Sequence, residues 1–191
     1  MKKGIIFISC KEKILIFFGS PHDRGTTGQM LKILINNLNS VYDIFVVNAF
    51  KILAKPCCDC AFCKENGKCQ YQDLDEVYAN LEKASKIIVV TPVYNCSFPA
   101  PLKAIFDRFQ VYFNFKNRKI HNQKKVFLLF SFGGRADSKI IESLLTQCEY
   151  VFKSINAKIS DFSLIDRTDE NKITTDILKK CSKNVIEKLL E

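Results

Sequence analysis

Apolar residues gather in five short runs, and between these runs they recur every three or four positions. Four runs are almost uninterrupted, which is typical of strands buried on both faces of a parallel sheet, and they span 13–19, 43–49, 86–93 and 124–132. The fifth run, 158–166, alternates apolar with polar residues. We therefore predict five strands, of which the fifth lies at an edge of the sheet.

Helical periodicity follows each predicted strand, with apolar residues one helical turn apart at 30–38, 74–81, 102–109, 141–152 and 177–185. Strands and helices that alternate strictly predict an α/β fold, a doubly wound sandwich with helices on both faces of the sheet. The sequence contains no linker rich in Gly, Ser or Pro and no internal repeat. We therefore expect one domain over residues 1–191.

The loop after the first strand reads "GSPHDRGTTGQML" and leads directly into a helix. Ligands of such sheets bind at the carboxyl ends of the strands. A small turn before a helix offers backbone N–H groups and the positive end of the helix dipole to a phosphate, and Ser20, Thr26 and Thr27 add hydroxyl groups. The loop lacks the nucleotide motifs G-x-x-x-x-G-K-[ST] and G-x-G-x-x-G. Helix capping by Thr26 or Thr27 is the alternative interpretation.

Two further loops fall at the same predicted edge. After the third strand, "TPVYNCSFPAPLKAIFDRF" carries Tyr94, Asn95 and Ser97 into a helix that begins near Pro99–Pro101. After the fourth strand, "FSFGGRADSK" places a pair of glycines where the backbone can approach a flat ring closely. The three loops together predict a phosphate site beside a slot for a planar heterocycle.

These three stretches resemble the flavin-contacting loops of the flavodoxin-like NAD(P)H-dependent FMN reductases, and the resemblance spans residues 13–155. It implies a flavodoxin-like three-layer sandwich with a five-stranded parallel sheet in the order 2-1-3-4-5. It also implies an FMN-binding oxidoreductase that passes electrons from NADH or NADPH through FMN to a small-molecule or protein acceptor. Because the flavin carries the chemistry in this family, no catalytic side chain is expected.

The resemblance also implies a set of cofactor contacts, with the phosphate at the first loop and the isoalloxazine ring at the other two. The expected residues are Ser20, His22, Arg24, Gly25, Thr26, Thr27, Pro92, Val93, Tyr94, Asn95, Cys96, Ser97, Gly133 and Gly134. This chain departs from the family pattern at two positions, since the family usually has Arg in place of His22 and Asn in place of Thr26. Either Arg24 supplies the positive charge or backbone donors hold the phosphate. His22 as a surface group and Tyr94 as a packing residue are the alternatives.

The stretch "KPCCDCAFCKENGKC" holds five of the nine cysteines, and four of them read C-x2-C-x2-C-x5-C. We treat residues 55–72 as a cysteine-rich insertion. Four thiolates so close together resemble the runs that bind a [4Fe-4S] cluster, and the candidate ligands, with Cys58 left over, are Cys57, Cys60, Cys63 and Cys69. Free thiols, a redox disulfide and a structural zinc site remain open.

With this segment included, the chain most resembles the iron-sulfur flavoprotein branch of the family. That branch implies an alternative function, an electron carrier with a [4Fe-4S] cluster that exchanges electrons with a ferredoxin-like partner. The resemblance also implies a homodimer or a higher homo-oligomer. Outside the segment, Cys148 and Cys181 lie on apolar helix faces and are expected in the core, and Asp107 and Arg108 are expected to pair with each other or to cap a helix.

Composition adds location and partners. The net charge of +9 comes from lysines scattered along the chain, which favours a solvated surface over nucleic-acid binding. An odd number of cysteines, too few for a disulfide scaffold, favours reduced thiols and the cytoplasm. No apolar run approaches the ~18 residues that span a membrane, and the apolar part of residues 1–11 is too short for a signal peptide, so we expect an N-terminal extension there.

Overall fold

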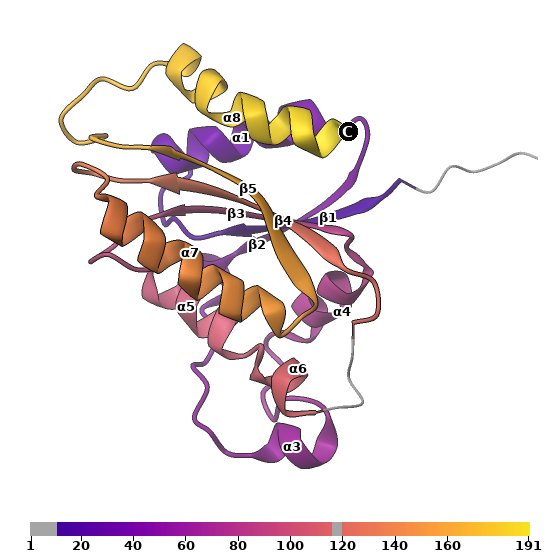
Figure 1. Cartoon of the computed structure of the whole chain (residues 1–191). Helices are drawn as coiled ribbons and strands as arrows, with labels where there is room; N and C mark the ends of the chain where they lie inside the picture. Colours follow the sequence, from indigo (N-terminus) through magenta and orange to yellow (C-terminus); the bar gives the residue numbers. More distant parts are fainter. Residues whose placement is uncertain (1–10, 116–119) are drawn as a thin grey trace, which may run out of the picture.

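The structure, a computed structural model, describes residues 11–115 and 120–191 (Figure 1). Its centre is a five-stranded sheet in the order β2-β1-β3-β4-β5, and every pair of neighbouring strands is parallel. The strands are β1 (Lys13–Phe18), β2 (Asp43–Asn48), β3 (Lys86–Pro92), β4 (Lys124–Ser131) and β5 (Ala157–Ile165). The predicted fold class and strand order are confirmed. Apart from Lys11, the expected N-terminal extension lies outside the described residues.

Helices cover both faces of the sheet, so the molecule has three layers (Figure 1). One face carries α1 (Thr26–Leu38) and α8 (Thr175–Leu190), and the other carries α4 (Asp75–Lys83), α5 (Ala100–Asp107) and α7 (Ser138–Lys153). Because side chains alternate along a strand, Ile14 and Ile16 of β1 pack toward α1 and α8, and Leu15 and Phe17 pack into the opposite core. Each face of β1 therefore anchors one helical layer.

Both edge strands are less buried than the centre of the sheet. The alternating strand β5 lies at an edge, as predicted, and its pairing with β4 shifts by one residue between Ile159 and Asp161. This irregularity is a β-bulge, a feature common on edge strands because it disturbs the pattern that a further strand would need. The prediction that residues 43–49 are buried on both faces is wrong, because β2 forms the other edge and only Val47 within β2 is fully covered.

Three short helices were not predicted, because they are too short to show a period: α2 (Ala49–Ile52), α3 (Phe62–Asn66) and α6 (Gln110–Asn114). The side chain of Asn48 caps α2 by accepting from the N–H groups of Phe50 and Lys51. The predicted period 102–109 is divided, since α5 ends at Asp107 and α6 begins two residues after the C-cap at Arg108.

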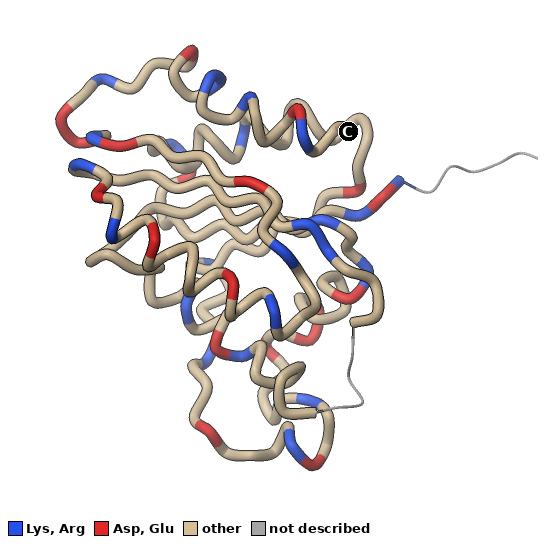
Figure 2. Tube along the Cα trace, in the orientation of Figure 1, with Lys and Arg blue, Asp and Glu red and all other residues tan. Residues whose placement is uncertain are grey.

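Lys and Arg residues are distributed over the strands and helices of all three layers (Figure 2). The Lys and Arg residues of the described part of the chain are therefore dispersed over its elements. Among the helices that the structure describes, none has both the length and the apolar character needed to cross a membrane.

Candidate functional site

A cavity of about 370 Å³ lies at the carboxyl ends of the strands, and we call it the loop cavity. It is lined by Ser20, His22, Gly25, Thr26, Thr27, Pro92, Val93, Tyr94, Ser131, Gly133, Thr168 and Asp169. These residues come from β3, the end of β4 and the segments that follow β1, β3, β4 and β5. The chain leaves β1 toward β2 and then returns to β3 on the other side, so the cavity lies at the switch point where such sheets bind ligands.

The first helical turn of α1 offers open backbone donors to the cavity. Its N-cap is Gly25, which has no side chain that could cap the helix, and the first turn contains no acidic residue. The N–H groups of the following residues have no intrahelical partner and lie at the positive end of the helix dipole. Ser20 is buried, and its Oγ accepts from the backbone N–H of His22 at 3.1 Å, which leaves its O–H free to donate. This arrangement suits a phosphate.

A buried pair of hydroxyl groups completes this end of the cavity. Thr27 Oγ1 and Ser131 Oγ are 2.7 Å apart, and both residues are almost fully buried. One hydrogen bond between two hydroxyl groups uses a single proton, so the second proton remains available to an oxygen atom in the cavity. Sequence reasoning missed Ser131 because it counted this residue as part of the fourth strand.

The loop after β3 forms a tight hairpin at the cavity wall. Tyr94 and Ser97 exchange two backbone hydrogen bonds of 2.9 Å, and the residues between them, Asn95 and Cys96, have φ of 46° and 61°. Positive φ at both central positions is the geometry of a type I′ turn. The hairpin turns Ser97 toward Gln147, 3.3 Å away on α7, and leaves Tyr94 lining the cavity.

The loop after β5 also lines the cavity, through Thr168 and Asp169. The N–H of Asp169 donates to the carbonyl of Gly133 at 3.1 Å, and the N–H of Thr168 donates to the carbonyl of Phe132 at 3.0 Å. A Cβ on Gly133 would lie 2.4 Å from Asp169 Oδ2, so a larger residue at this position would displace the carboxylate of Asp169. Asp169 brings the only carboxylate that the described residues contribute to the cavity wall. Sequence reasoning missed this loop because it contains no glycine or hydroxyl-rich turn before a helix.

Nine of the expected cofactor residues line one cavity, with Gly25 and Gly133 among them. The expected residues that do not line it are Arg24, Asn95, Cys96, Ser97 and Gly134. Arg24 is exposed and does not line the cavity, so it does not replace the arginine that the family usually has at the position of His22. The geometry therefore favours backbone and hydroxyl donors for the phosphate.

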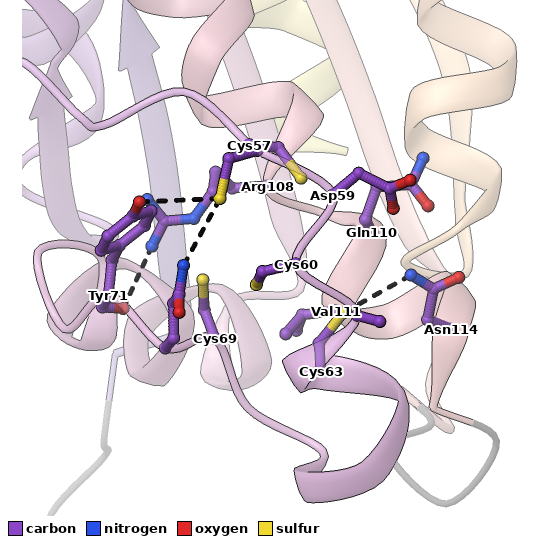
Figure 3. A pocket seen from close by; sticks show the side chains of 13 residues that line it. Cys57, Asp59, Cys60, Cys63, Cys69, Tyr71, Arg108, Gln110, Val111 and Asn114 are labelled. Carbon is purple, nitrogen blue, oxygen red and sulfur yellow. Dashed lines mark hydrogen bonds between the residues drawn. The ribbon is translucent and has the colours of Figure 1, made fainter.

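A second cavity lies away from the sheet, beneath α5 and α6, and we call it the cysteine cavity (Figure 3). Its lining includes all five cysteines of the segment 55–72, which we call the cysteine segment: Cys57, Cys58, Cys60, Cys63 and Cys69. All five are free thiols, and the space between them is about 30 Å³, close to that of one water molecule. Tyr71, Arg108 and Asn114 complete the wall together with neighbouring residues.

The thiols differ in their surroundings. The hydrogen bond with Tyr71, 3.6 Å away, lowers the pKa of Cys58 and raises that of Tyr71, and Gln70 Nε2 donates to the same sulfur at 3.4 Å. Cys63 Sγ accepts from Asn114 Nδ2 at 3.4 Å (Figure 3). Cys63 and Cys69 are half-buried against the core, whereas the other three cysteines are exposed.

The donor set of the cysteine cavity fits an iron-sulfur cluster by chemistry, because thiolates are the ligands that such clusters take. Among residues 11–115 and 120–191, no three ligating side chains are placed to hold a single ion. Cys57, Cys60, Cys63 and Cys69 as cluster ligands remain a prediction.

Comparison with known proteins agrees with this picture. The sequence profile of the NADPH-dependent FMN reductases matches residues 12–163. An iron-sulfur flavoprotein of Methanosarcina thermophila is 39% identical over 93 residues, or 47% of this chain and 47% of that protein. An iron-sulfur flavoprotein of Methanocaldococcus jannaschii is 34% identical over 99 residues, which are 50% of this chain and 51% of that protein. The chain thus spans about half the length of the curated relatives it matches.

A solved structure shares the fold over nearly the whole chain. The NAD(P)H:quinone oxidoreductase from Methanothermobacter marburgensis superposes with a TM-score of 0.75 at 15% sequence identity, and it covers 95% of this chain and 98% of that one. The profile match supports FMN as the ligand of the loop cavity and confirms the resemblance that the three loops predicted. The match spans residues 12–163, which is more than half of the sequence. The chain therefore belongs to the NADPH-dependent FMN reductase family.

Proposed function

We propose that this protein is an FMN-dependent oxidoreductase that takes electrons from NADH or NADPH and passes them to a small-molecule or protein acceptor. The observation that carries the proposal is the convergence of the loops after β1, β3 and β4 on one cavity in a member of the FMN reductase family. Bound FMN would supply the redox chemistry, taking a hydride from the nicotinamide and yielding two electrons to the acceptor.

Different residues of the loop cavity would contact different parts of the cofactor. The open N–H groups of α1, with Ser20 and Thr27, would hold the phosphate, and Ser131 would orient the hydroxyl of Thr27. The backbone at Pro92–Tyr94 and at Gly133 would face the ring. Of the expected residues outside the lining, Asn95 and Cys96 would act through the shape of the turn after β3.

Two measurements test this proposal. The purified chain should quench the fluorescence of added FMN and retain FMN, rather than FAD, through chromatography, because the cavity offers a single phosphate site. It should then oxidise NADH or NADPH in the presence of a dye acceptor, and removal of FMN should abolish this activity. Retention of FAD, or no retained flavin after incubation with excess FMN, contradicts the proposal.

A second function is supported by a separate observation, the five cysteines that line one cavity in a chain similar to iron-sulfur flavoproteins. In this alternative Cys57, Cys60, Cys63 and Cys69 hold a [4Fe-4S] cluster that relays single electrons between FMN and a ferredoxin-like protein. Anaerobic reconstitution with iron and sulfide should give about four iron atoms per chain, as the cluster formula requires. The iron should be lost in Cys60→Ser, and an iron-free chain with full NADPH oxidation leaves the first function alone.

We further propose that one domain over residues 1–191 carries the activity as a homodimer in the cytoplasm. The eight cysteines among the described residues are free, which agrees with a reducing compartment. Sedimentation of the flavin-loaded protein tests the dimer, and a mass equal to a single chain contradicts it.

A further inference from the structure

Arg108 is the buried cation of the cysteine cavity. Its side chain is 1% exposed, although it follows the last residue of α5 on the outer layer of the fold. A guanidinium group is costly to remove from water and remains buried only where several acceptors surround it. The burial of Arg108 therefore indicates that surrounding acceptors hold its guanidinium group in one position.

The acceptors of Arg108 are the two ends of the cysteine segment. At the first end, Nη1 donates to the carbonyl of Lys55 at 2.8 Å. At the other end, Nη2 donates to the carbonyl of Tyr71 at 3.1 Å and to Asp73 Oδ1 at 2.8 Å. The ends also contact each other, since the N–H of Lys55 donates to Asp73 Oδ2 at 2.8 Å. One side chain thus ties together two points that lie 16 residues apart in sequence.

The same guanidinium group lies beside the thiols. Arg108 lines the cysteine cavity together with Cys63 and Cys69, and its group lies over the ring of Tyr71 with 5.2 Å from Cζ to the ring centroid (Figure 3). Its Nε is buried and has no hydrogen-bond partner among the described residues. Arg108 therefore has one donor left over at the cavity after both ends of the segment are tied.

We propose that Arg108 is the positioning residue of the cysteine segment, tying its two ends so that the thiols face one cavity in a conformation able to take up an iron-sulfur centre. Arginine suits this role because its planar fork reaches three acceptors at fixed angles, whereas lysine offers a point charge. The uptake of an iron-sulfur centre rests on the second proposed function. The tie between the two ends of the segment rests on the contacts of Arg108 alone.

The first experiment reads the geometry of the segment without metal. Metal-free, reduced protein is treated with a maleimide, and the labelling rate of each cysteine is followed by peptide mass spectrometry. In Arg108→Met, labelling of the half-buried Cys63 and Cys69 should become about tenfold faster or more, because charge-assisted hydrogen bonds that close the segment are lost. Arg108→Lys should fall between Arg108→Met and the wild-type chain. The matched control is Lys103→Met on the same helix, since Lys103 pairs with Asp107 and not with the segment.

The second experiment reads metal uptake. Iron bound after anaerobic reconstitution is titrated with a chelator in each variant. Loss of Arg108 should weaken iron retention about ten- to a hundredfold, as expected when an outer-shell partner is removed, while Lys103→Met retains iron like the wild-type chain. FMN binding and far-ultraviolet circular dichroism serve as checks of the fold.

The outcomes are distinguishable. Unchanged labelling of Cys63 and Cys69 in a folded Arg108→Met variant overturns the inference, whatever the iron content. If Arg108→Met does not fold, Asp73→Asn removes the charged acceptor, and unchanged labelling in that variant overturns the inference in the same way. A wild-type chain that takes up no iron sinks the second proposed function, and faster labelling in Arg108→Met still supports the tie between the two ends.

Discussion

At the scale of single residues, the hydroxyl pair of Thr27 and Ser131 makes the sharpest prediction for cofactor binding. Thr27→Val removes one hydroxyl at constant shape and should weaken FMN binding by about 1.5–3 kcal/mol, the value of one hydrogen bond to a charged group. Ser131→Ala should also weaken binding, because the two hydroxyl groups share one proton network. Fluorescence titration of both variants and of the double variant should give less than the sum of the single effects. Strict additivity would show that the two groups act separately.

At Gly28, steric fit and helix propensity predict opposite effects of a substitution by alanine. It lies in the first turn of α1, where alanine would stabilise an ordinary helix by about 1 kcal/mol. A Cβ at this position would lie 2.4 Å from the carbonyl oxygen of Asp23 and 2.6 Å from that of His22, and backbone atoms cannot move aside cheaply. The clash should win, so Gly28→Ala should open the loop after β1 and reduce FMN affinity.

The matched control is Gly134→Ala, where an added Cβ meets no atom within 4 Å. It should bind FMN like the wild-type chain in the same titration. Equal FMN affinity of Gly28→Ala and the control would mean that the loop after β1 does not hold the phosphate.

Residues of the site were predictable where the chain gives a local signal. Ser20, Thr26 and Thr27 stand between an apolar run and a helical period, so their place at the sheet edge follows from the sequence. Asp169 reaches the cavity only because β5 pairs with β4 in a register that sets Ile165 beside Ser131. No local pattern encodes that register, and neither Asp169 nor the partners of the buried Arg108 were foreseen. Asp107 and Arg108 were expected to pair with each other or to cap a helix. The pairing is wrong, since each pairs with another residue, but Arg108 is the C-cap of α5.

At the scale of elements, the link between α5 and the cysteine segment should respond to pH. Burial opposes ionisation of Asp73, but hydrogen bonds from Arg108 and from the N–H of Lys55 outweigh burial and lower its pKa. Below about pH 4, the ordinary pKa of an unfolded Asp, the unfolded chain takes up the proton first. The stability contributed by Asp73 is therefore present above that pH and is lost as the pH falls through the lower pKa of the folded state.

Urea unfolding from neutral pH to about pH 3 measures this effect. Asp73→Asn should be less stable than the wild-type chain at neutral pH, and the difference should shrink as the pH falls. A difference that stays constant over this range contradicts the assignment of the ion pair.

Helix α7 offers a test of the core. Cys148 is fully buried, and burial raises the pKa of its thiol to about 12, so it should resist thiol reagents in the native protein at neutral pH. Cys148→Ala should cost about 1 kcal/mol of stability with FMN affinity unchanged. Cys181 is half-buried, so Cys181→Ala should cost less in the same unfolding experiment. If Cys148→Ala lowers the free energy of FMN binding more than the free energy of unfolding, Cys148 contributes to flavin binding rather than to core packing alone.

The strands and long helices were predictable because burial and helical periodicity leave a direct trace in the sequence. The short helices leave no such trace. Helix α2 depends on one capping side chain, and α6 is separated from α5 by an interruption of the helix. The edge position of β2 was also hidden, because its apolar run looks like that of a central strand although the structure covers only Val47 completely.

At the scale of the whole molecule, strand order cannot be read from hydrophobic pattern, because every permutation of five buried strands gives similar runs. The order came from the resemblance of three loops, and the observed sheet agrees with it. Helix α5 begins after the hairpin that lines the loop cavity and ends at Arg108 in the cysteine cavity, so it connects them over about 12 Å.

The contact between Lys55 and Asp73 gives the cysteine segment the character of an exchangeable module. Because the chain leaves and re-enters the body of the protein at nearly the same point, residues 56–72 should be removable, with a short Gly-Ser turn in their place. The excision should be combined with Arg108→Met, since the guanidinium group would otherwise lose the carbonyl acceptor of Tyr71. The shortened protein should keep its circular dichroism spectrum and bind FMN, and failure to bind would show that the module also shapes the flavin site. Segments of other cysteine spacing could then be grafted onto the same two anchors, so that one reductase scaffold accepts different electron-relay centres.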